Sequence, residues 1–249
     1  MQLANSCRLN PENTNIQFMR EISGSPASSI FEITYDNVTY ALKLYHDNGD
    51  PGLTERGRDL NRYRCELKAY MNLLRHGVCD RGFVPYFYGY IDRLDPSTFQ
   101  PALRHFTHDK LHPSAILLEY LPAAESLNCV NYSTALYNTA IEGMKEIHNA
   151  HVHHRDIYPK NILLSEGGSK KRLVWVDFDV STTFNSTGPE EEKYSKYEEE
   201  LVVGCGKALA LTSFLARGPK TRSSPEYEVL LNMALPKLQK PAFGQYMLD

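Results

Sequence analysis

Two stretches decide the fold of this chain: His154-Arg155-Asp156-Ile157-Tyr158-Pro159-Lys160-Asn161 and Val176-Asp177-Phe178-Asp179. Asp156 and Asn161 are five residues apart, and Asp177 follows Asn161 by 16 residues. Between them lies a short apolar run, Ile162-Leu163-Leu164, which predicts a strand. One carboxylate that orients a hydroxyl, together with an Asn/Asp pair that holds magnesium, is the layout of a phosphoryl-transfer site.

The bulk composition is typical of a soluble globular protein. The 249 residues are 42% hydrophobic and 23% charged, a length that fits one large domain or two small lobes. A net charge of −3 gives no basic excess, so we expect neither nucleic acid nor membrane as a partner. The N-terminus lacks the apolar core of a secretory signal, and no apolar run approaches the ~20 residues of a membrane span. Five cysteines scattered singly predict reduced thiols and a cytoplasmic or nuclear location.

Hydrophobic periodicity and turn residues predict strands in the first half of the chain and mainly helices in the second, an α+β pattern. A polar insertion rich in Pro and His is expected at 92–113, a loose lead-in at 1–15 and a mixed tail at 217–249. The predicted strands are 30–35, 38–44, 83–91, 115–120, 161–164 and 173–176, and the predicted helices are about 54–75, 132–150 and 189–215.

The two motifs resemble those of the protein-kinase-like superfamily, and the resemblance covers roughly residues 20–185. It implies an α+β, two-lobed kinase-like fold in a single domain, 1–249. The β-rich N-lobe would span 16–119, and a mainly helical, shortened C-lobe would span 120–249. ATP and Mg²⁺ would bind between the lobes as cofactors.

By this resemblance, the catalytic loop supplies the residues that do the chemistry. Asp156 matches the aspartate that orients the acceptor hydroxyl and takes its proton, and Asn161 and Asp177 match the magnesium ligands. The alternatives are a turn residue for Asn161, a helix-capping or turn residue for Asp156 and a strand-end cap for Asp177. Serine/threonine kinases place a lysine two residues after the catalytic aspartate, where this chain has Tyr158. Lys160, four residues after Asp156, would supply that cation instead, although a solvated lysine would look the same.

The resemblance also assigns the nucleotide-binding residues. Lys43, in Tyr40-Ala41-Leu42-Lys43, would hold the α- and β-phosphates, with Glu66 as its partner and Glu55 as the second candidate. Glu119 and Leu121 follow an apolar strand and resemble the hinge whose backbone groups bind adenine. A surface glutamate and an ordinary strand end are the alternatives for Glu66 and for the hinge.

The expected phosphate loop departs from the family pattern. Along Ile22–Ile30, the three glycine positions hold Ser23, Ser25 and Ser28. A serine hydroxyl can donate to phosphate, but serine does not match glycine for close backbone approach or positive φ. A plain Ser/Gly turn is therefore the competing interpretation.

Several histidines also need an interpretation. His105, His108 and His112 lie in the insertion without supporting Cys or carboxylate ligands, so we expect a solvated loop more than a zinc site. His154, in the motif itself, is expected to be a packed, hydrogen-bonded scaffold residue and not a base.

The sequence departs from the protein-kinase pattern at two further points. Asp179 stands where protein kinases have the glycine of Asp-Phe-Gly, and it would add a carboxylate near the metal. This Asp-Phe-Asp motif, with His-Arg-Asp, is most similar to fungal-type atypical kinase-like proteins. After Asp179 the next aspartate is Asp249, so the buried aspartate that braces the catalytic loop in protein kinases has no counterpart.

The predicted function is transfer of the γ-phosphate of ATP to a hydroxyl, with ATP and an unidentified acceptor as the partners. An acidic residue at the position of Asp179 resembles small-molecule kinases of the aminoglycoside and choline type. This resemblance and the short C-terminal part favour a small-molecule acceptor over a protein. The alternatives are a protein serine/threonine/tyrosine kinase and a pseudokinase-like binding module, which the serine-substituted loop and the absent brace favour.

Overall fold

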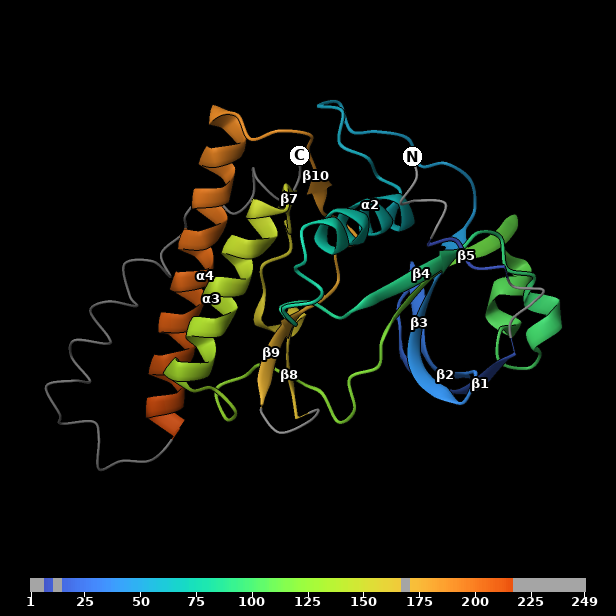
Figure 1. Cartoon of the computed structure of the whole chain (residues 1–249), viewed down its shortest axis with the longest axis horizontal. Helices are drawn as coiled ribbons and strands as arrows, with labels where there is room; N and C mark the ends of the chain where they lie inside the picture. The colour runs from blue at the N-terminus through green and yellow to red at the C-terminus, as the bar shows by residue number, and fades with distance from the viewer. Residues whose placement is uncertain (1–6, 11–14, 167–170, 217–249) are drawn as a thin grey trace, which may run out of the picture.

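A computed structural model describes residues 7–10, 15–166 and 171–216, which form a mixed α/β structure with one large sheet and a few helices (Figure 1). The mixed tail predicted at 217–249 lies outside the described residues. The large sheet is antiparallel, with strand order β1-β2-β3-β5-β4. Its strands are β1 (Ile16–Gly24), β2 (Ser28–Tyr35), β3 (Val38–Asp47), β4 (Phe87–Ile91) and β5 (Leu111–Glu119).

The β2–β3 hairpin confirms the predicted strand pair and its turn. Asp36 and Asn37 have φ values of 49° and 63°, in the left-handed region that Asp and Asn tolerate better than most residues. This tight two-residue turn fixes the register, so that Ile30 pairs with Lys43. The turn thereby sets where Lys43 lies in the sheet.

Helix α2 (Arg62–Arg75) is shorter than predicted. Residues 54–61, expected to be helical, form a loop in which Gly57 has a φ of 82°. The helix begins after Asn61, whose side chain accepts a hydrogen bond from the Arg64 amide at 2.9 Å. This N-cap satisfies an amide that the first turn leaves without a helical partner.

The insertion at 92–113 is not the solvated loop that its composition predicts. It contains two 3₁₀ helices, η2 (Pro96–Phe99) and η3 (Arg104–His108). Its apolar side chains Leu94, Leu103 and Phe106 are buried together with Phe31 and Leu44 of the sheet. The insertion therefore covers one face of the sheet. At the edge of the same sheet, Arg8 in the predicted loose lead-in bridges to Tyr90 of β4.

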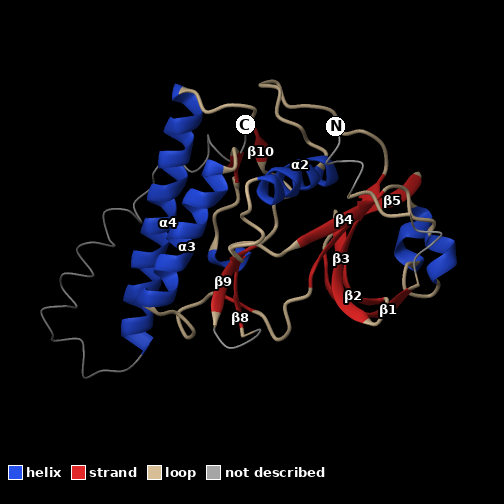
Figure 2. Cartoon of the chain, viewed as in Figure 1, coloured by secondary structure: helices blue, strands red, loops and turns tan. Residues whose placement is uncertain are grey.

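The second half of the chain carries the other elements (Figure 2), and its predicted strands and helices are confirmed. Helices α3 and α4 pack side by side at the end of the molecule opposite the large sheet (Figure 1). A cluster of buried apolar side chains runs from Tyr70 of α2 through Trp175 and Phe178 to Met144 of α3. None of the helices in the described part of the chain combines the length and apolar character that a membrane span requires. The elements are β6 (Glu125–Ser126), α3 (Thr134–Asn149), β7 (Val152–His153), η4 (Pro159–Asn161), β8 (Ile162–Ser165), β9 (Arg172–Trp175), β10 (Thr182–Thr183) and α4 (Pro189–Ala216).

Two glycines of α4 provide a matched test of the α3–α4 packing. A Cβ at Gly206 would overlap the buried ring of Tyr137 on α3, whereas a Cβ at Gly204 would meet no atom within 4 Å. We expect Gly206→Ala to lower the free energy of unfolding by about 1–3 kcal/mol. Gly204→Ala is expected to raise it by about 0.5–1 kcal/mol, because alanine favours the helix. Urea unfolding measures both, and equal effects would contradict this packing.

Candidate functional site

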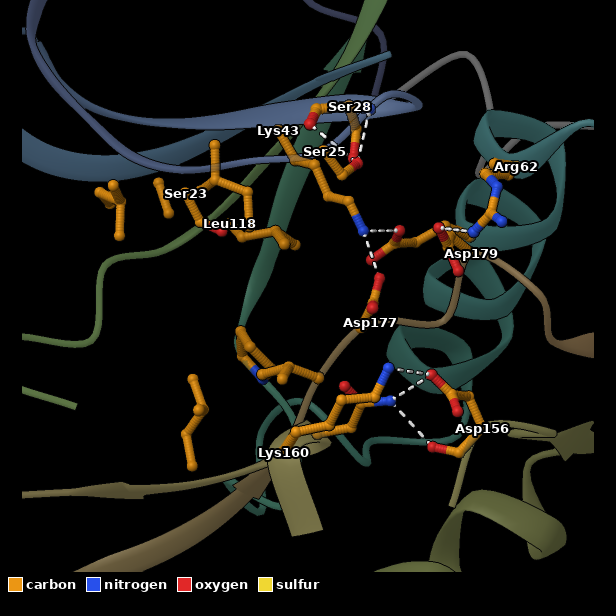
Figure 3. Close-up of a pocket in the computed structure, with 18 of the residues that line it drawn as sticks. Ser23, Ser25, Ser28, Lys43, Arg62, Leu118, Asp156, Lys160, Asp177 and Asp179 are labelled. Atoms are coloured by element: carbon orange, nitrogen blue, oxygen red, sulfur yellow. Dashed lines mark hydrogen bonds and ion pairs between the residues drawn. The ribbon is translucent and has the colours of Figure 1, made fainter. Parts of the chain in front are cut away.

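A single cavity of about 1090 Å³ is lined by the twelve residues to which the resemblance first assigns catalytic, nucleotide-binding or metal-binding roles. They come from both halves of the chain, from the β1–β2 turn to the segment that follows β9 (Figure 3). They are Ser23, Ser25, Ser28, Lys43, Glu66, Glu119, Leu121, Asp156, Lys160, Asn161, Asp177 and Asp179.

Lys43 lies at the centre of a buried ion network. Its Nζ atom is 2.6 Å from Glu66 Oε2 and 2.7 Å from Asp177 Oδ1. Burial by itself would lower the pKa of Lys43, but the charges of Glu66 and Asp177 outweigh burial and raise the pKa above its ordinary value. Lys43 is therefore a fixed cation. Its helical partner is Glu66, whereas Glu55, the second candidate, is an exposed residue of the preceding loop.

Asp177 follows β9 in a left-handed backbone conformation, with a φ of 68°. Burial favours its neutral form, but the nearby Lys43 ammonium outweighs burial and lowers the pKa of Asp177. The carboxylate is therefore ionised at neutral pH, as a ligand of a divalent cation must be.

Asp156 is held by two neighbours in its own loop. The Asn161 side-chain amide donates to both the backbone oxygen and the Oδ2 atom of Asp156, each at 2.8 Å. Lys160 Nζ lies 3.0 Å from the same Oδ2 atom. Since Asn161 uses its amide nitrogen in these contacts, its side-chain oxygen is left for the cavity.

Asp179 has a partner that the sequence did not suggest. Its Oδ2 atom lies 2.5 Å from Nη1 of Arg62, the first residue of α2 (Figure 3). Asp179 is buried and Arg62 is half exposed. The carboxylate expected beside the metal thus has one oxygen committed to α2.

His154 is the scaffold residue that its position in the motif predicts. Its Nε2–H donates to the Val176 backbone oxygen at 3.0 Å, and its Nδ1 lies 3.3 Å from the Asp156 amide. Burial lowers the pKa of His154, so the ring is neutral and accepts at Nδ1. The imidazole thereby links the two motif segments.

The loop at 154–161 does have a buried acidic brace, which corrects the prediction that it lacks one. Glu198 of α4, 1% exposed, accepts hydrogen bonds from the backbone amides of His154 (3.1 Å) and Arg155 (2.8 Å). It also contacts His148 Nε2 of α3 at 2.8 Å. Burial favours the neutral carboxyl, but the hydrogen bond from His148 outweighs burial and lowers the pKa of Glu198. A glutamate of α4 therefore braces this loop, where protein kinases have an aspartate.

The serine-rich turn between β1 and β2 is closed on itself. Ser25 Oγ lies 3.2 Å from the Ala27 amide and 3.1 Å from the Ser28 amide, and the Ser25 amide donates to the Ser28 oxygen. These amides already have partners, so the turn presents fewer donors to a phosphate than an open glycine loop would.

The strand end at Glu119 is anchored from two sides. Its amide donates to the Tyr86 oxygen at 2.8 Å, and its carboxylate contacts Arg172. The adenine-binding role of Glu119 and Leu121 stays a prediction. The apolar side chains Ile30, Ala41, Leu118 and Leu163 also line the cavity. The sequence did not single them out, although each lies in or beside a predicted strand and faces the expected nucleotide side.

The metal interpretation of the insertion histidines finds no support in the structure. Within the described ranges, no group of three or more His, Cys, Asp or Glu side chains is placed to hold a metal ion. His105 and His108 lie in η3, on the far side of the sheet from the cavity lining.

The segment that contains both motifs is similar to a known protein family. Residues 108–188 match the model of the Lipopolysaccharide kinase (Kdo/WaaP) family. That family lies within the protein-kinase-like superfamily, so the match supports the coarser resemblance drawn from the motifs. It covers about a third of the chain, including Asp156, Asn161 and Asp177 but not Lys43 or Glu66. Among curated proteins, the chain has no match. The similarity to fungal-type kinase-like proteins stays a prediction.

Proposed function

We propose that this protein is an ATP- and magnesium-dependent phosphotransferase that moves the γ-phosphate to a hydroxyl of a small-molecule acceptor. The observation that carries the proposal is the cavity that joins Asp156, Asn161 and Asp177 with the Lys43–Glu66 ion pair. The match to a lipopolysaccharide kinase family supports a sugar as the acceptor class.

In this proposal, Asp156 orients the acceptor hydroxyl and accepts its proton. The acceptor oxygen bonds to the γ-phosphorus, the bond to the bridging oxygen breaks, and ADP leaves. Lys43 holds the phosphate oxygens of the nucleotide, and Lys160, next to Asp156, offsets negative charge at the transferred group.

The residues present fit a magnesium ion. The Asn161 side-chain oxygen and the ionised Asp177 carboxylate are hard oxygen ligands, and both line the cavity. When bound, the ion would neutralise charge on the phosphate oxygens. Asp179 was expected to join these ligands, but its Oδ2 atom faces Arg62.

We also propose the two-lobed arrangement that the kinase resemblance implies, with the lobes at 16–119 and 120–249 within a single domain and the nucleotide between them. The large sheet contributes Lys43 to the cavity, and the second half contributes Asp156 and Asp177. Adenine would lie against the apolar lining near Leu118.

A binding module without catalysis is the second candidate, favoured by the closed serine turn at Ser25. Thermal unfolding with ATP and Mg²⁺ tests the nucleotide binding that the phosphotransferase requires. At about 100 times Kd, a bound nucleotide is expected to raise Tm by roughly 5–10 °C, and EDTA should remove the magnesium-dependent part. No stabilisation by Mg-ATP would contradict the proposal.

Transfer itself is measured with labelled ATP and a panel of monosaccharides, amino alcohols and mixed peptides. The expected result is label on a small-molecule hydroxyl. Label on peptides alone would favour the protein-kinase alternative, and stabilisation by Mg-ATP without any transfer would favour the binding module.

A further inference from the structure

One face of α2 is linked to each residue of the Asp177–Asp179 segment, to Asp179 and Phe178 directly and to Asp177 through Lys43. Arg62, Glu66 and Tyr70 are four residues apart, so their side chains lie on the same side of the helix. The first of them, Arg62, makes the 2.5 Å ion pair with Asp179.

The other two contacts continue along the helix. Glu66 reaches Asp177 through Lys43, with distances of 2.6 and 2.7 Å at the two steps. Tyr70 packs edge-on against Phe178, with ring centroids 5.5 Å apart. Three successive turns of α2 are therefore linked to the three residues of the Asp-Phe-Asp motif.

The Arg62–Asp179 ion pair matters more to Asp179 than to Arg62, because Asp179 is the more buried of the two. The Asp179 side chain is 8% exposed and that of Arg62 is 48% exposed. A buried carboxylate without a partner is costly, and Arg62 is the only cation among the described residues in ion-pair contact with it. A metal ion at the same oxygen would face the guanidinium charge at close range.

We propose that Asp179 is a positioning residue and not a metal ligand. With Arg62 it forms a latch that holds the first turn of α2 against the segment carrying Asp177. The latch keeps Glu66 within reach of Lys43, and it fixes a loop that a glycine at position 179 would leave free to move. This inference rests on the proposed phosphotransferase function.

A double-mutant cycle tests the latch in the full chain without ligand. We expect Arg62→Gln to lower Tm by roughly 3–8 °C, because it leaves the buried Asp179 carboxylate without its partner. Asp179→Asn is expected to lower Tm by less, because water can solvate the half-exposed Arg62 guanidinium. The double variant should lose no more than the worse single variant. Lys68→Gln, an exposed position on the same helix, is the control and should leave Tm within about 1–2 °C of the original protein. Losses that add up in the double variant would overturn the latch.

Catalysis supplies a second readout. Both single variants are expected to lower kcat about tenfold or more through misplacement of Glu66 and Lys43. The half-saturating Mg²⁺ concentration should stay within about twofold, since the proposed ligands are unchanged. Arg62→Lys, which keeps the cation, is expected to recover most of kcat.

The alternative role of Asp179 gives a different pattern. A metal ligand at this position would make Asp179→Asn raise the half-saturating Mg²⁺ about tenfold or more while Arg62→Gln left it unchanged, and that result would overturn the inference. If no variant and not even the original chain bound Mg-ATP, the proposed function would fail, while the unfolding cycle would still decide whether the latch exists.

Discussion

Replacing Asp156 by asparagine is expected to lower phosphoryl transfer by about 10²- to 10⁴-fold and to leave Mg-ATP binding intact. The substitution keeps the shape of the side chain, so the Asn161 amide and Lys160 can still meet an oxygen at this position. It removes the carboxylate that takes the proton from the acceptor hydroxyl. Single-turnover transfer of label measures the first effect, and the Tm rise with Mg-ATP measures the second.

Asp80→Asn is the matched control for this experiment. Asp80 is exposed and does not line the cavity, so its replacement should change neither readout. Undiminished transfer by the Asp156 variant would remove this residue from the role of base. Loss of Mg-ATP binding along with transfer would instead assign it to nucleotide or metal binding.

That the residues with proposed catalytic roles lie together was predictable from sequence, because their spacing is set by local structure. Asp156 and Asn161 are joined by a single short loop, so the distance between them in sequence fixes their distance in space. Lys43 and Glu66 are 23 residues apart, but each lies on an element with a clear periodic pattern. The ion pair between them needs only that the helix packs on the sheet.

The brace at Glu198 could not be predicted in the same way. It lies in a run of glutamates, Glu198-Glu199-Glu200, which by composition reads as the solvated face of a helix. Only the packing of α4 against β7 and α3 turns the first of the three inward, onto His148 and the catalytic loop. The longer glutamate side chain reaches the backbone amides that an aspartate braces in protein kinases.

The start of α2 and the fold of the insertion were missed for a different reason. Helical spacing of apolar residues does not mark where a helix begins, and Asn61, a good N-cap, was the available signal. In the insertion, Leu103 and Phe106 lie among Pro and His residues without a regular period. Their burial depends on the sheet face opposite them, which no local pattern encodes.

Glu198 lies outside the cavity lining, yet its substitution should have a large effect on stability. We expect Glu198→Ala to lower the free energy of unfolding by about 3–5 kcal/mol, because the His154 and Arg155 amides and His148 lose a buried acceptor. Glu198→Gln should cost about 1–3 kcal/mol, since its amide nitrogen cannot accept where one carboxylate oxygen did. Urea unfolding at neutral pH measures both.

The same variants should impair catalysis, because the braced amides belong to the residues directly before Asp156. A displacement of about 1 Å at Asp156 is enough to lower transfer about 100-fold. The depressed pKa of Glu198 means that its contribution to stability is present at neutral pH and is lost as the pH falls through that pKa in the folded protein. The difference in the free energy of unfolding between the original chain and Glu198→Gln should therefore become smaller at acidic pH. Glu200 is exposed on the same helix, so Glu200→Gln is the control and should change neither stability nor transfer. An equally mild effect of the Glu198 substitutions would show that α4 does not brace the loop.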